Sequence, residues 1–395
     1  PMAQGPGALP PAFTQALARA GVPPQAVGVM VTALPPQGGA AAKPEVRLSH
    51  RADATMNPAS VMKLVTTYAA LDLLGPDFTW SNRVYVDGPV SDGVLDGNLI
   101  LRGSGDPKLV LERLDALLRQ VIAQGVREVR GDIVLDRAVF DVPERDPGAF
   151  DDEPLRPYNA SPDGLLVNFK ALVFTFTPDP ARGRVLVRSE PPIAGVDIPA
   201  EVPLAAGACG DWRTHLRADF SSPQRVQFAG RYAASCGERI WPVAYVEPRT
   251  YAARVVHAMW QGAGGRLGGR VREGATPANA RLWLAAESLP VGTVIADINK
   301  FSNNVMAQQV FLTFSSQPHG PGTFEGSRQR LVRWWRERFA GQPAPVLDNG
   351  SGLSRDNRLT AQCLARMLQL AWASPLMPEL LASLPEEQRP VAEQV

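Results

Sequence analysis

The order of hydrophobic patterns along the 395 residues constrains the fold of this chain more than any other feature. Near both ends, short strand-like runs accompany longer segments in which apolar residues recur with the spacing of an α-helix. In the middle, short β-type runs separated by Gly, Pro and Asp turns dominate. A chain that is α/β, then mostly β, then α/β again is typical of one domain interrupted by an insert.

The length exceeds what one hydrophobic core usually serves, so we expect a multidomain α/β protein. We place a divided main domain at residues 1–80 and 283–395. An inserted domain is expected at residues 81–170 and 246–282, with a nested β domain at 171–245.

Individual elements follow from the same patterns. Strands are predicted at Val27–Leu34, Val46–Leu48, Arg83–Val86, Leu99–Leu101, Ile133–Leu135, Leu165–Phe169, Val173–Phe176, Arg184–Val187, Leu282–Ala285 and Val291–Ile298. Helices are predicted at Leu109–Gln124, Pro248–Trp260, Phe301–Phe314, Ser327–Phe339 and Thr360–Trp372, in addition to one that follows Ser60.

The most informative short motif is Ser60-Val61-Met62-Lys63, which begins an apolar segment that ends at Gly75-Pro76. Positions three residues apart share one helix face, so the Ser60 hydroxyl and the Lys63 amine can meet at the first turn. Burial lowers the pKa of a lysine, and such a lysine can act as a general base where an arginine cannot. The alternative is a helix-starting serine and a lysine whose side chain extends to the surface.

Composition bears on this motif and on the class of protein. Lysine occurs only at positions 43, 63, 108, 170 and 300, and arginine supplies all the other basic residues. A lysine retained inside an apolar helix of such a chain favours a chemical role for Lys63. The net charge is +1, with both signs interspersed, so no footprint for nucleic acid or a membrane surface is expected.

The location of the protein is predicted from its apolar runs and cysteines. No apolar run reaches the length of a membrane span, and Pro1–Pro11 lacks the pattern of a signal peptide, so we expect a soluble chain whose export signal has already been removed. Cys209 and Cys236 lie in a polar, Gly-rich region and are expected to form a disulfide, whereas Cys363 is expected to be a buried thiol. Three unpaired cysteines are the alternative. The four histidines are scattered, without the spacing of metal ligands.

A second polar cluster, Ser302-Asn303-Asn304, lies where a loop meets a predicted helix. A hydroxyl and a carboxamide two residues apart can serve proton transfer on one side and hold a substrate amide on the other. The alternative is an ordinary helix cap, because Ser and Asn are preferred at that position.

Together these motifs resemble the active site of the penicillin-recognising serine enzymes, whose motifs are Ser-x-x-Lys, Ser-x-Asn and Lys-Thr-Gly. Longer phrases resemble one branch, the D-alanyl-D-alanine carboxypeptidase/endopeptidase family of low-molecular-mass, class C penicillin-binding proteins. These phrases are Asn57–Lys63, Leu101–Pro107, Tyr158–Ala160, Leu166–Phe169, Asn299–Asn304 and Asn349–Arg355. The two serines are 242 positions apart (302 minus 60), which fits the large two-part insert of that branch.

The resemblance implies a transpeptidase-type domain split by two smaller, mostly β domains, and a role for each motif residue. Ser60 would be the acylated nucleophile and Lys63 the base that takes its proton. Ser302 would pass a proton to the leaving group, and Asn304 would orient the peptide. Backbone N–H groups of Ser60 and of the strand that bears the third motif would hold the oxyanion.

The same resemblance implies a periplasmic serine peptidase that needs no bound cofactor. Its substrates would be peptidoglycan stem peptides, with β-lactam antibiotics as covalent inhibitors. Whether it is a carboxypeptidase or an endopeptidase, and its oligomeric state, stay open. A non-catalytic peptidoglycan-binding protein and a β-lactamase-like or esterase activity are the rival hypotheses. A hydrolase with a Gly-x-Ser-x-Gly elbow is disfavoured, since the sequence has no such motif.

One departure concerns the third motif. The sequence contains no Lys-Thr-Gly, Lys-Ser-Gly or His-Thr-Gly, and after Ser383 it runs through Glu386 and Glu387 to Val395. In the family, this motif provides an oxyanion donor and a cation for the substrate carboxylate, so its loss would weaken catalysis by orders of magnitude. Several strands of the main sheet would be missing as well. The sequence leaves open whether this part has been truncated or has been lost from the protein.

Overall fold

The computed structural model describes residues 8–34, 45–316 and 320–385 of the chain. They form two compact units. Unit 1 comprises the described parts of Pro1–Phe78 and Pro290–Val395, and unit 2 is Thr79–Leu289. The predicted loop at 35–43 and the segment from Glu386 onward lie outside the described residues.

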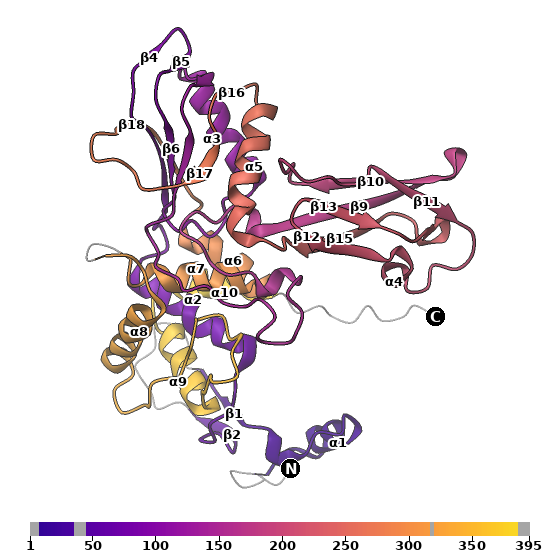
Figure 1. Cartoon of the computed structure of the whole chain (residues 1–395). Helices are drawn as coiled ribbons and strands as arrows, with labels where there is room; N and C mark the ends of the chain where they lie inside the picture. Colours follow the sequence, from indigo (N-terminus) through magenta and orange to yellow (C-terminus); the bar gives the residue numbers. More distant parts are fainter. Residues whose placement is uncertain (1–7, 35–44, 317–319, 386–395) are drawn as a thin grey trace. The chain divides into compact units, whose positions relative to one another are not determined.

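Unit 1 is built mainly of helices (Figure 1). The helices are α1 (Pro11–Arg19), α2 (Met62–Leu73), α6 (Val291–Phe301), α7 (Asn304–Thr313), α8 (Phe324–Arg338), α9 (Ala361–Trp372) and α10 (Met377–Ser383). Every residue of α7 is buried, as are nine of the twelve residues of α2. These two helices are apolar around most of their circumference, which is typical of helices at the centre of a core.

Side-chain hydrogen bonds link helices α6, α8 and α10 to α2 or to one another. On α8, the Trp334 indole N–H donates to Asp72 Oδ2 at 2.6 Å, and Arg338 donates to both oxygens of the same carboxylate. Asn299 of α6 donates to Thr67 of α2 at 3.2 Å and to Ser383 of α10 at 2.8 Å. The bonds of Trp334 and Asn299 satisfy polar groups that are buried or half-buried, so they help to specify how these helices are placed.

A two-stranded antiparallel sheet, β1 (Val29–Thr32) and β2 (Val46–His50), completes the described part of unit 1. This is the hairpin expected from the two apolar runs. Helix α9 packs against β1, and Gln369 donates to Thr32 Oγ1 at 3.0 Å. Cys363 lies in α9 as a buried free thiol, as predicted.

Two predicted strands are wrong. Residues 165–169 form no strand, because Asn168 and Phe169 have positive φ values and begin the 3-10 turn Asn168–Lys170. Residues 291–298 belong to helix α6, not to a strand. The β-branched residues of this segment favour a strand, but its buried residues are Val291, Val294, Ile295 and Ile298, which have the i, i+3, i+4, i+7 spacing of a helix. The predicted helix at 301–314 correspondingly begins later, at Asn304.

The chain leaves and re-enters unit 1 at adjacent points. Val291 N–H donates to Phe78 O at 2.9 Å, and Gly292 N–H donates to Pro76 O at 2.9 Å. Within unit 2, Ser288 N–H donates to Trp80 O at 2.8 Å. The two connecting segments therefore run side by side, and the whole of unit 2 lies between them in sequence.

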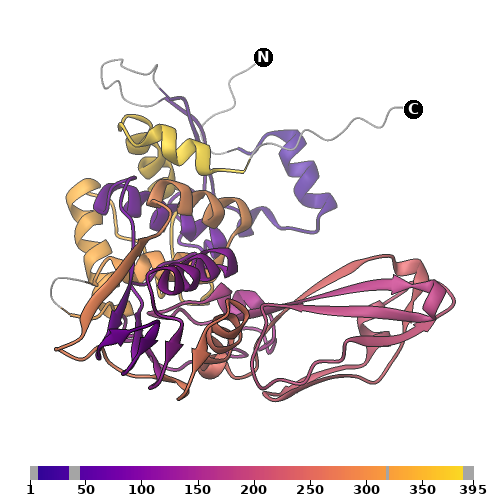
Figure 2. The same ribbon diagram turned by 90° about the horizontal axis from the view of Figure 1, so that it is seen from above.

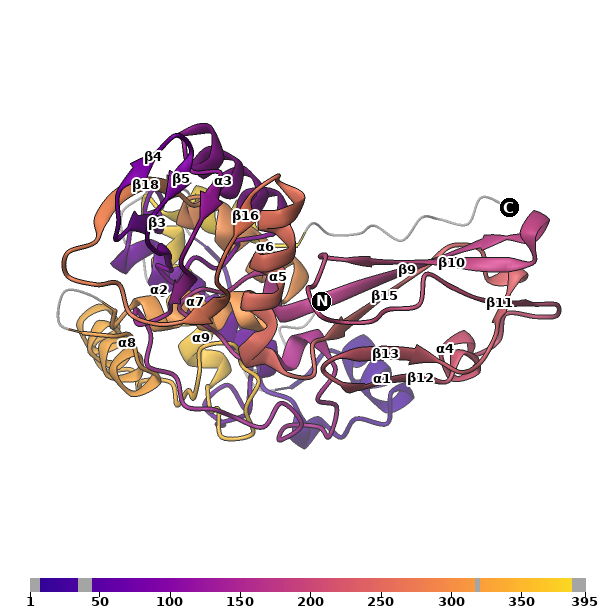
Figure 3. The same cartoon turned by 45° about the horizontal axis from the view of Figure 1, so that its top comes forward.

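Part of unit 2 is a five-stranded sheet covered by two helices, α3 (Leu111–Ala123) and α5 (Pro248–Gly262), which Figure 3 shows beside it. Its strands are β3 (Ser81–Val86), β6 (Leu99–Arg102), β8 (Ile133–Asp136), β17 (Val271–Glu273) and β18 (Arg281–Glu287), in the order β17-β8-β6-β3-β18. A smaller sheet has the order β16-β7-β5-β4, from β4 (Val90–Ser91), β5 (Val94–Leu95), β7 (Glu128–Val129) and β16 (Arg266–Leu267).

The rest of unit 2 is the elongated β structure seen in Figure 2. Its sheet has the order β14-β11-β10-β9-β15, from β9 (Ala171–Asp179), β10 (Arg184–Glu190), β11 (Glu201–Ala205), β14 (Tyr232–Ala233) and β15 (Arg239–Ala244). Helix α4 (Trp212–Leu216) and the hairpin of β12 (Ala218–Ser222) and β13 (Arg225–Phe228) pack on it. Aromatic rings fill the space between, with Phe176 contacting Trp212, Phe228 and Tyr232 at centroid distances of 5.7, 5.4 and 5.7 Å.

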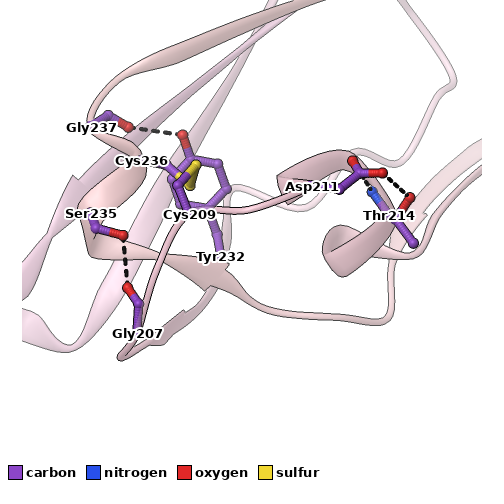
Figure 4. The surroundings of a disulfide bond; sticks show 8 residues. All are labelled: Gly207, Cys209, Asp211, Thr214, Tyr232, Ser235, Cys236 and Gly237. Atoms are coloured by element: carbon purple, nitrogen blue, oxygen red, sulfur yellow. Dashed lines mark hydrogen bonds between the residues drawn. A yellow bond between two sulfur atoms is a disulfide. The ribbon is translucent and has the colours of Figure 1, made fainter.

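The Cys209–Cys236 disulfide closes one end of this β structure (Figure 4) and confirms the predicted pairing. Tyr232 OH donates to Gly237 O at 2.8 Å, and Ser235 Oγ donates to Gly207 O at 2.7 Å on the other side of the bond. The disulfide therefore joins two loops that are also linked by hydrogen bonds. Among the described residues, no helix combines the length and the apolar character needed to cross a membrane.

We predict that replacing both cysteines, in Cys209→Ser/Cys236→Ser, lowers the free energy of unfolding of unit 2 by about 3 kcal/mol. The bond links positions 27 residues apart, and a loop of that size gives a stabilisation of this order in the chain-entropy account. Urea unfolding followed by tryptophan fluorescence measures the change. Dithiothreitol should shift the wild-type transition and leave that of the double variant in place; equal shifts in both would contradict the prediction.

Candidate active site

Ser60 lies in a short 3-10 turn, Ala59–Val61, that leads directly into α2. The turn is held from both sides by Asn57, whose Oδ1 accepts from Ala59 N–H at 2.9 Å and whose Nδ2 donates to Ser354 O at 2.9 Å. Ala59 has a φ of 45°, a left-handed conformation that is costly for a residue other than glycine. Ser60 is exposed, whereas Met62, two residues later, is fully buried.

Lys63 is buried, with only 2 % of its surface exposed. Its Nζ lies 3.2 Å from Ser60 Oγ, 2.5 Å from Asn304 Oδ1 and 2.7 Å from the backbone oxygen of Ser351. Burial lowers the pKa of Lys63 from 10.5 to about 8. The sequence left open a lysine whose side chain extends to the surface. In the structure, Lys63 is buried instead.

The three neighbours of this amine suit a base rather than a fixed cation. A neutral lysine has two N–H bonds and one lone pair. The oxygens of Asn304 and Ser351 can only accept, so they fix the two N–H bonds. The third direction faces Ser60 Oγ, and there the lone pair can accept the hydroxyl proton.

Ser302 and Asn304 reach the site from a break between two helices. Ser302 ends α6 in the left-handed conformation, with a φ of 52°, and its Oγ lies 2.9 Å from Ser60 Oγ. The helix cap proposed as the alternative does exist, but it is Asn303, whose Oδ1 accepts from Met306 N–H at 3.0 Å. The flanking residues, Ser302 and Asn304, are thereby both directed towards the Ser60–Lys63 pair.

Ser351 contributes to the site although it belongs to neither of the two short motifs. Its backbone oxygen accepts from Lys63, while Asn349 Oδ1 accepts from both Ser351 N–H at 3.0 Å and Ser351 Oγ at 2.7 Å. Gly352 has a φ of 86°, and a Cβ there would lie 1.9 Å from Ala59 O. The sequence signal for this contribution is the turn-forming run Asn349-Gly350-Ser351-Gly352, which lies within one of the phrases that carry the resemblance.

The structure thus brings Ser60, Lys63, Ser302 and Asn304 together in unit 1. The remaining predicted residues, Cys209 and Cys236, belong to unit 2 as its disulfide. Within the described residues, no group of three or more His, Cys, Asp or Glu side chains is placed to hold a metal ion.

Comparisons with known proteins identify relatives of this chain. The chain is 30% identical over 348 residues to a D-alanyl-D-alanine carboxypeptidase of Actinomadura sp., covering 83% of this chain and 62% of that protein. It is 24% identical over 315 residues to the D-alanyl-D-alanine carboxypeptidase DacB of Haemophilus influenzae, covering 80% of this chain and 66% of that protein. The chain thus spans slightly less than two thirds of the length of these two relatives.

A solved structure shows the same fold. The crystal structure of penicillin binding protein 4 (dacB) from Haemophilus influenzae superposes with a TM-score of 0.70 at 22% identity, covering 86% of this chain and 75% of that chain. The family described as D-Ala-D-Ala carboxypeptidase 3 (S13) matches residues 19–386. Since this match includes both serine motifs and the whole of unit 2, the chain belongs to the D-Ala-D-Ala carboxypeptidase 3 (S13) family.

Proposed function

We propose that this protein is a serine DD-peptidase that cleaves D-Ala-D-Ala or D-Ala cross-links in peptidoglycan stem peptides through an acyl-enzyme at Ser60. The observation that carries the proposal is the exposed Ser60 hydroxyl 3.2 Å from a buried lysine whose pKa is about 8. The family membership and the names of the two relatives support the same reaction class.

In the proposed acylation, neutral Lys63 takes the Ser60 proton while Oγ attacks the carbonyl carbon of the penultimate D-Ala. The tetrahedral intermediate collapses as the C–N bond breaks. Ser302 donates its hydroxyl proton to the leaving nitrogen and regains one from the Lys63 ammonium, which becomes neutral again. The 2.9 Å separation of the two hydroxyl oxygens makes this relay short. Water then attacks the ester carbonyl and gives a proton to neutral Lys63. The ester C–O bond breaks, and Lys63 returns the proton to Ser60 Oγ, which restores the hydroxyl. Asn304 both holds Lys63 and orients the peptide.

Further parts of the proposal concern inhibitors and location. A structure of the Haemophilus influenzae protein in complex with a novel beta-lactam superposes on this chain with a TM-score of 0.65 at 21% identity. We propose that β-lactams acylate Ser60 here too, because they present a strained amide to the same nucleophile. A periplasmic location is in keeping with the disulfide, since such bonds persist in oxidising compartments.

We predict that benzylpenicillin adds one covalent equivalent to the wild-type chain and none to Ser60→Ala. The reason is that the Ser60 hydroxyl lies 3.2 Å from Lys63, whose pKa is lowered by burial. Intact-mass spectrometry before and after incubation, with tryptic mapping of the modified peptide, measures the result. Equal labelling of the two proteins would exclude the proposed nucleophile.

The same measurement distinguishes the proposed peptidase from a second candidate function. That second candidate is a peptidoglycan-binding protein that is not acylated. Binding to purified peptidoglycan without any mass increase would support that function, and a stoichiometric adduct would exclude it. Rapid turnover of nitrocefin without a lasting adduct would indicate a β-lactamase-like hydrolase instead.

The acylation rate should rise with pH until about pH 8 and then level off. Below that value Lys63 is mostly protonated and cannot accept the Ser60 proton, so each unit of pH lowers the rate about tenfold. Acylation rates measured with a fluorescent penicillin at a series of pH values give the midpoint of the pH dependence. A rate that is flat across pH 8, or that falls as the pH rises, would refute Lys63 as the base.

Replacing Lys63 by arginine should lower the acylation rate by about three orders of magnitude, because arginine keeps the charge but does not deprotonate. Lys108→Arg, in unit 2, is the matched control and should acylate at the wild-type rate. Circular dichroism establishes that both variants are folded. An active Lys63→Arg protein would place the base elsewhere.

Asn349 provides a test of how Lys63 is positioned. In Asn349→Ala, the buried Ser351 N–H and hydroxyl lose their acceptor, so we expect acylation to fall about tenfold. In Asn349→Asp the acceptor is kept and a negative charge is added, so the pH midpoint should move above about 8. A purely structural role for Asn349 would leave the midpoint of both variants unchanged.

A further inference from the structure

Unit 2 contains a second concave site, a cavity of about 320 Å³ that none of the active-site residues lines. Its walls come from the loop after β8, from residues 161–164 and from the beginning of α5. A cavity of this size accommodates an amino acid or a dipeptide. Charged residues line it from several elements, among them Arg137, Lys170, Arg249, Glu144 and Glu273.

The floor of the cavity is a buried ionic cluster. Asp163 is nearly inaccessible, and it accepts from Arg137 Nε at 2.6 Å and lies 2.8 Å from Lys170 Nζ. Burial alone would raise the pKa of the Asp163 carboxyl, but Lys170 and Arg137 outweigh burial and hold it below its ordinary value. The carboxylate is therefore ionised. Arg137 makes a second ion pair with Glu273.

Lys170 has more donors than this cluster satisfies. Its side chain is 7 % exposed, and an ammonium has three N–H bonds. Among the described residues, Asp163 is the one partner placed within reach of this ammonium. Because a buried ammonium with unsatisfied N–H bonds is costly, the cavity beside it is a favourable place for an oxygen acceptor.

The backbone that presents Lys170 is strained. Asn168, Phe169 and Lys170 have φ values of 41°, 55° and 55°, so three consecutive residues other than glycine adopt the left-handed conformation. Such conformations are costly, and they persist where surrounding structure imposes them, often at ligand sites. The lining is also tightly packed at Gly164, where a Cβ would lie 2.1 Å from Arg137 O.

We propose that this cavity binds the carboxylate of a short peptide or amino acid, with Lys170 as the buried cation that receives it. Arg249, at the start of α5, adds positive charge at the rim, and Glu144, which pairs with it at 3.2 Å, offers a partner for an ammonium group on the same ligand. The site lies wholly within unit 2, and its occupancy requires neither Ser60 nor any covalent step.

The scarcity of lysine makes the test direct. With lysine labelled at ¹³Cε, the full chain gives only five labelled side chains, at positions 43, 63, 108, 170 and 300. N-acetylglycine, which carries a carboxylate, is titrated to about 50 mM at constant ionic strength, a range suited to weak binding. N-acetylglycinamide, which lacks the carboxylate, is the matched control ligand. The signal that disappears in Lys170→Met is assigned to Lys170. If Lys170→Met does not fold, the variants Lys63→Arg, Lys108→Arg and Lys300→Arg each remove one other signal and narrow the assignment by elimination.

The expected result is a saturable shift of the Lys170 signal with N-acetylglycine, at least five times larger than with N-acetylglycinamide, while Lys108 and Lys300 stay in place. The Ser60→Ala chain should give the same shift, which separates this site from the proposed catalysis. No shift, an equal shift with the amide, or a uniform drift of all lysine signals would overturn the proposal.

Discussion

The arrangement at Ser60 depends on one constraint, which is that the Lys63 amine is buried and all the partners described for it are neutral. A carboxylate in place of Asn304 or the Ser351 carbonyl would hold the lysine as a cation and prevent it from acting as the proposed base. With neutral acceptors, burial is the dominant influence, and it brings the pKa to about 8. The residues Ser60, Asn304 and Ser351 must therefore meet at Lys63 Nζ from three separate parts of the chain. The packing of the helices in unit 1 brings them together.

The two buried lysines show how the same residue type serves different ends. Lys63 contacts amide and hydroxyl oxygens, whereas Lys170 contacts the ionised carboxylate of Asp163. Burial without a counter-charge disfavours the charged form of Lys63. Asp163 provides a counter-charge for Lys170. Burial alone therefore does not distinguish the role proposed for Lys63 from that proposed for Lys170. The difference lies in the nearest oxygens, which are neutral around Lys63 and carry a negative charge beside Lys170. Both sites also share a feature of backbone geometry, a left-handed residue other than glycine next to the functional side chain.

Local patterns predict much of this structure. The Ser60–Lys63 turn, the β1–β2 hairpin and the disulfide follow from spacing and composition, because each depends on residues close in sequence or on a distinctive residue type. The strand predicted at 291–298 is wrong because tertiary packing along one helix face overrides the β preference of its valines and isoleucines. The Ser351 carbonyl could not be predicted, since a backbone oxygen carries no residue signature and acquires its role only when a loop 288 positions from Lys63 folds against it.

The paired segments at Phe78 and Val291 bear on how such a chain can change over evolutionary time. Because the polypeptide leaves and returns at neighbouring points, the distance that any connecting segment must span does not depend on what lies between. A short turn or several domains would close the same gap. The insert can therefore be enlarged, shortened or replaced without any change in the helical core that contains Ser60.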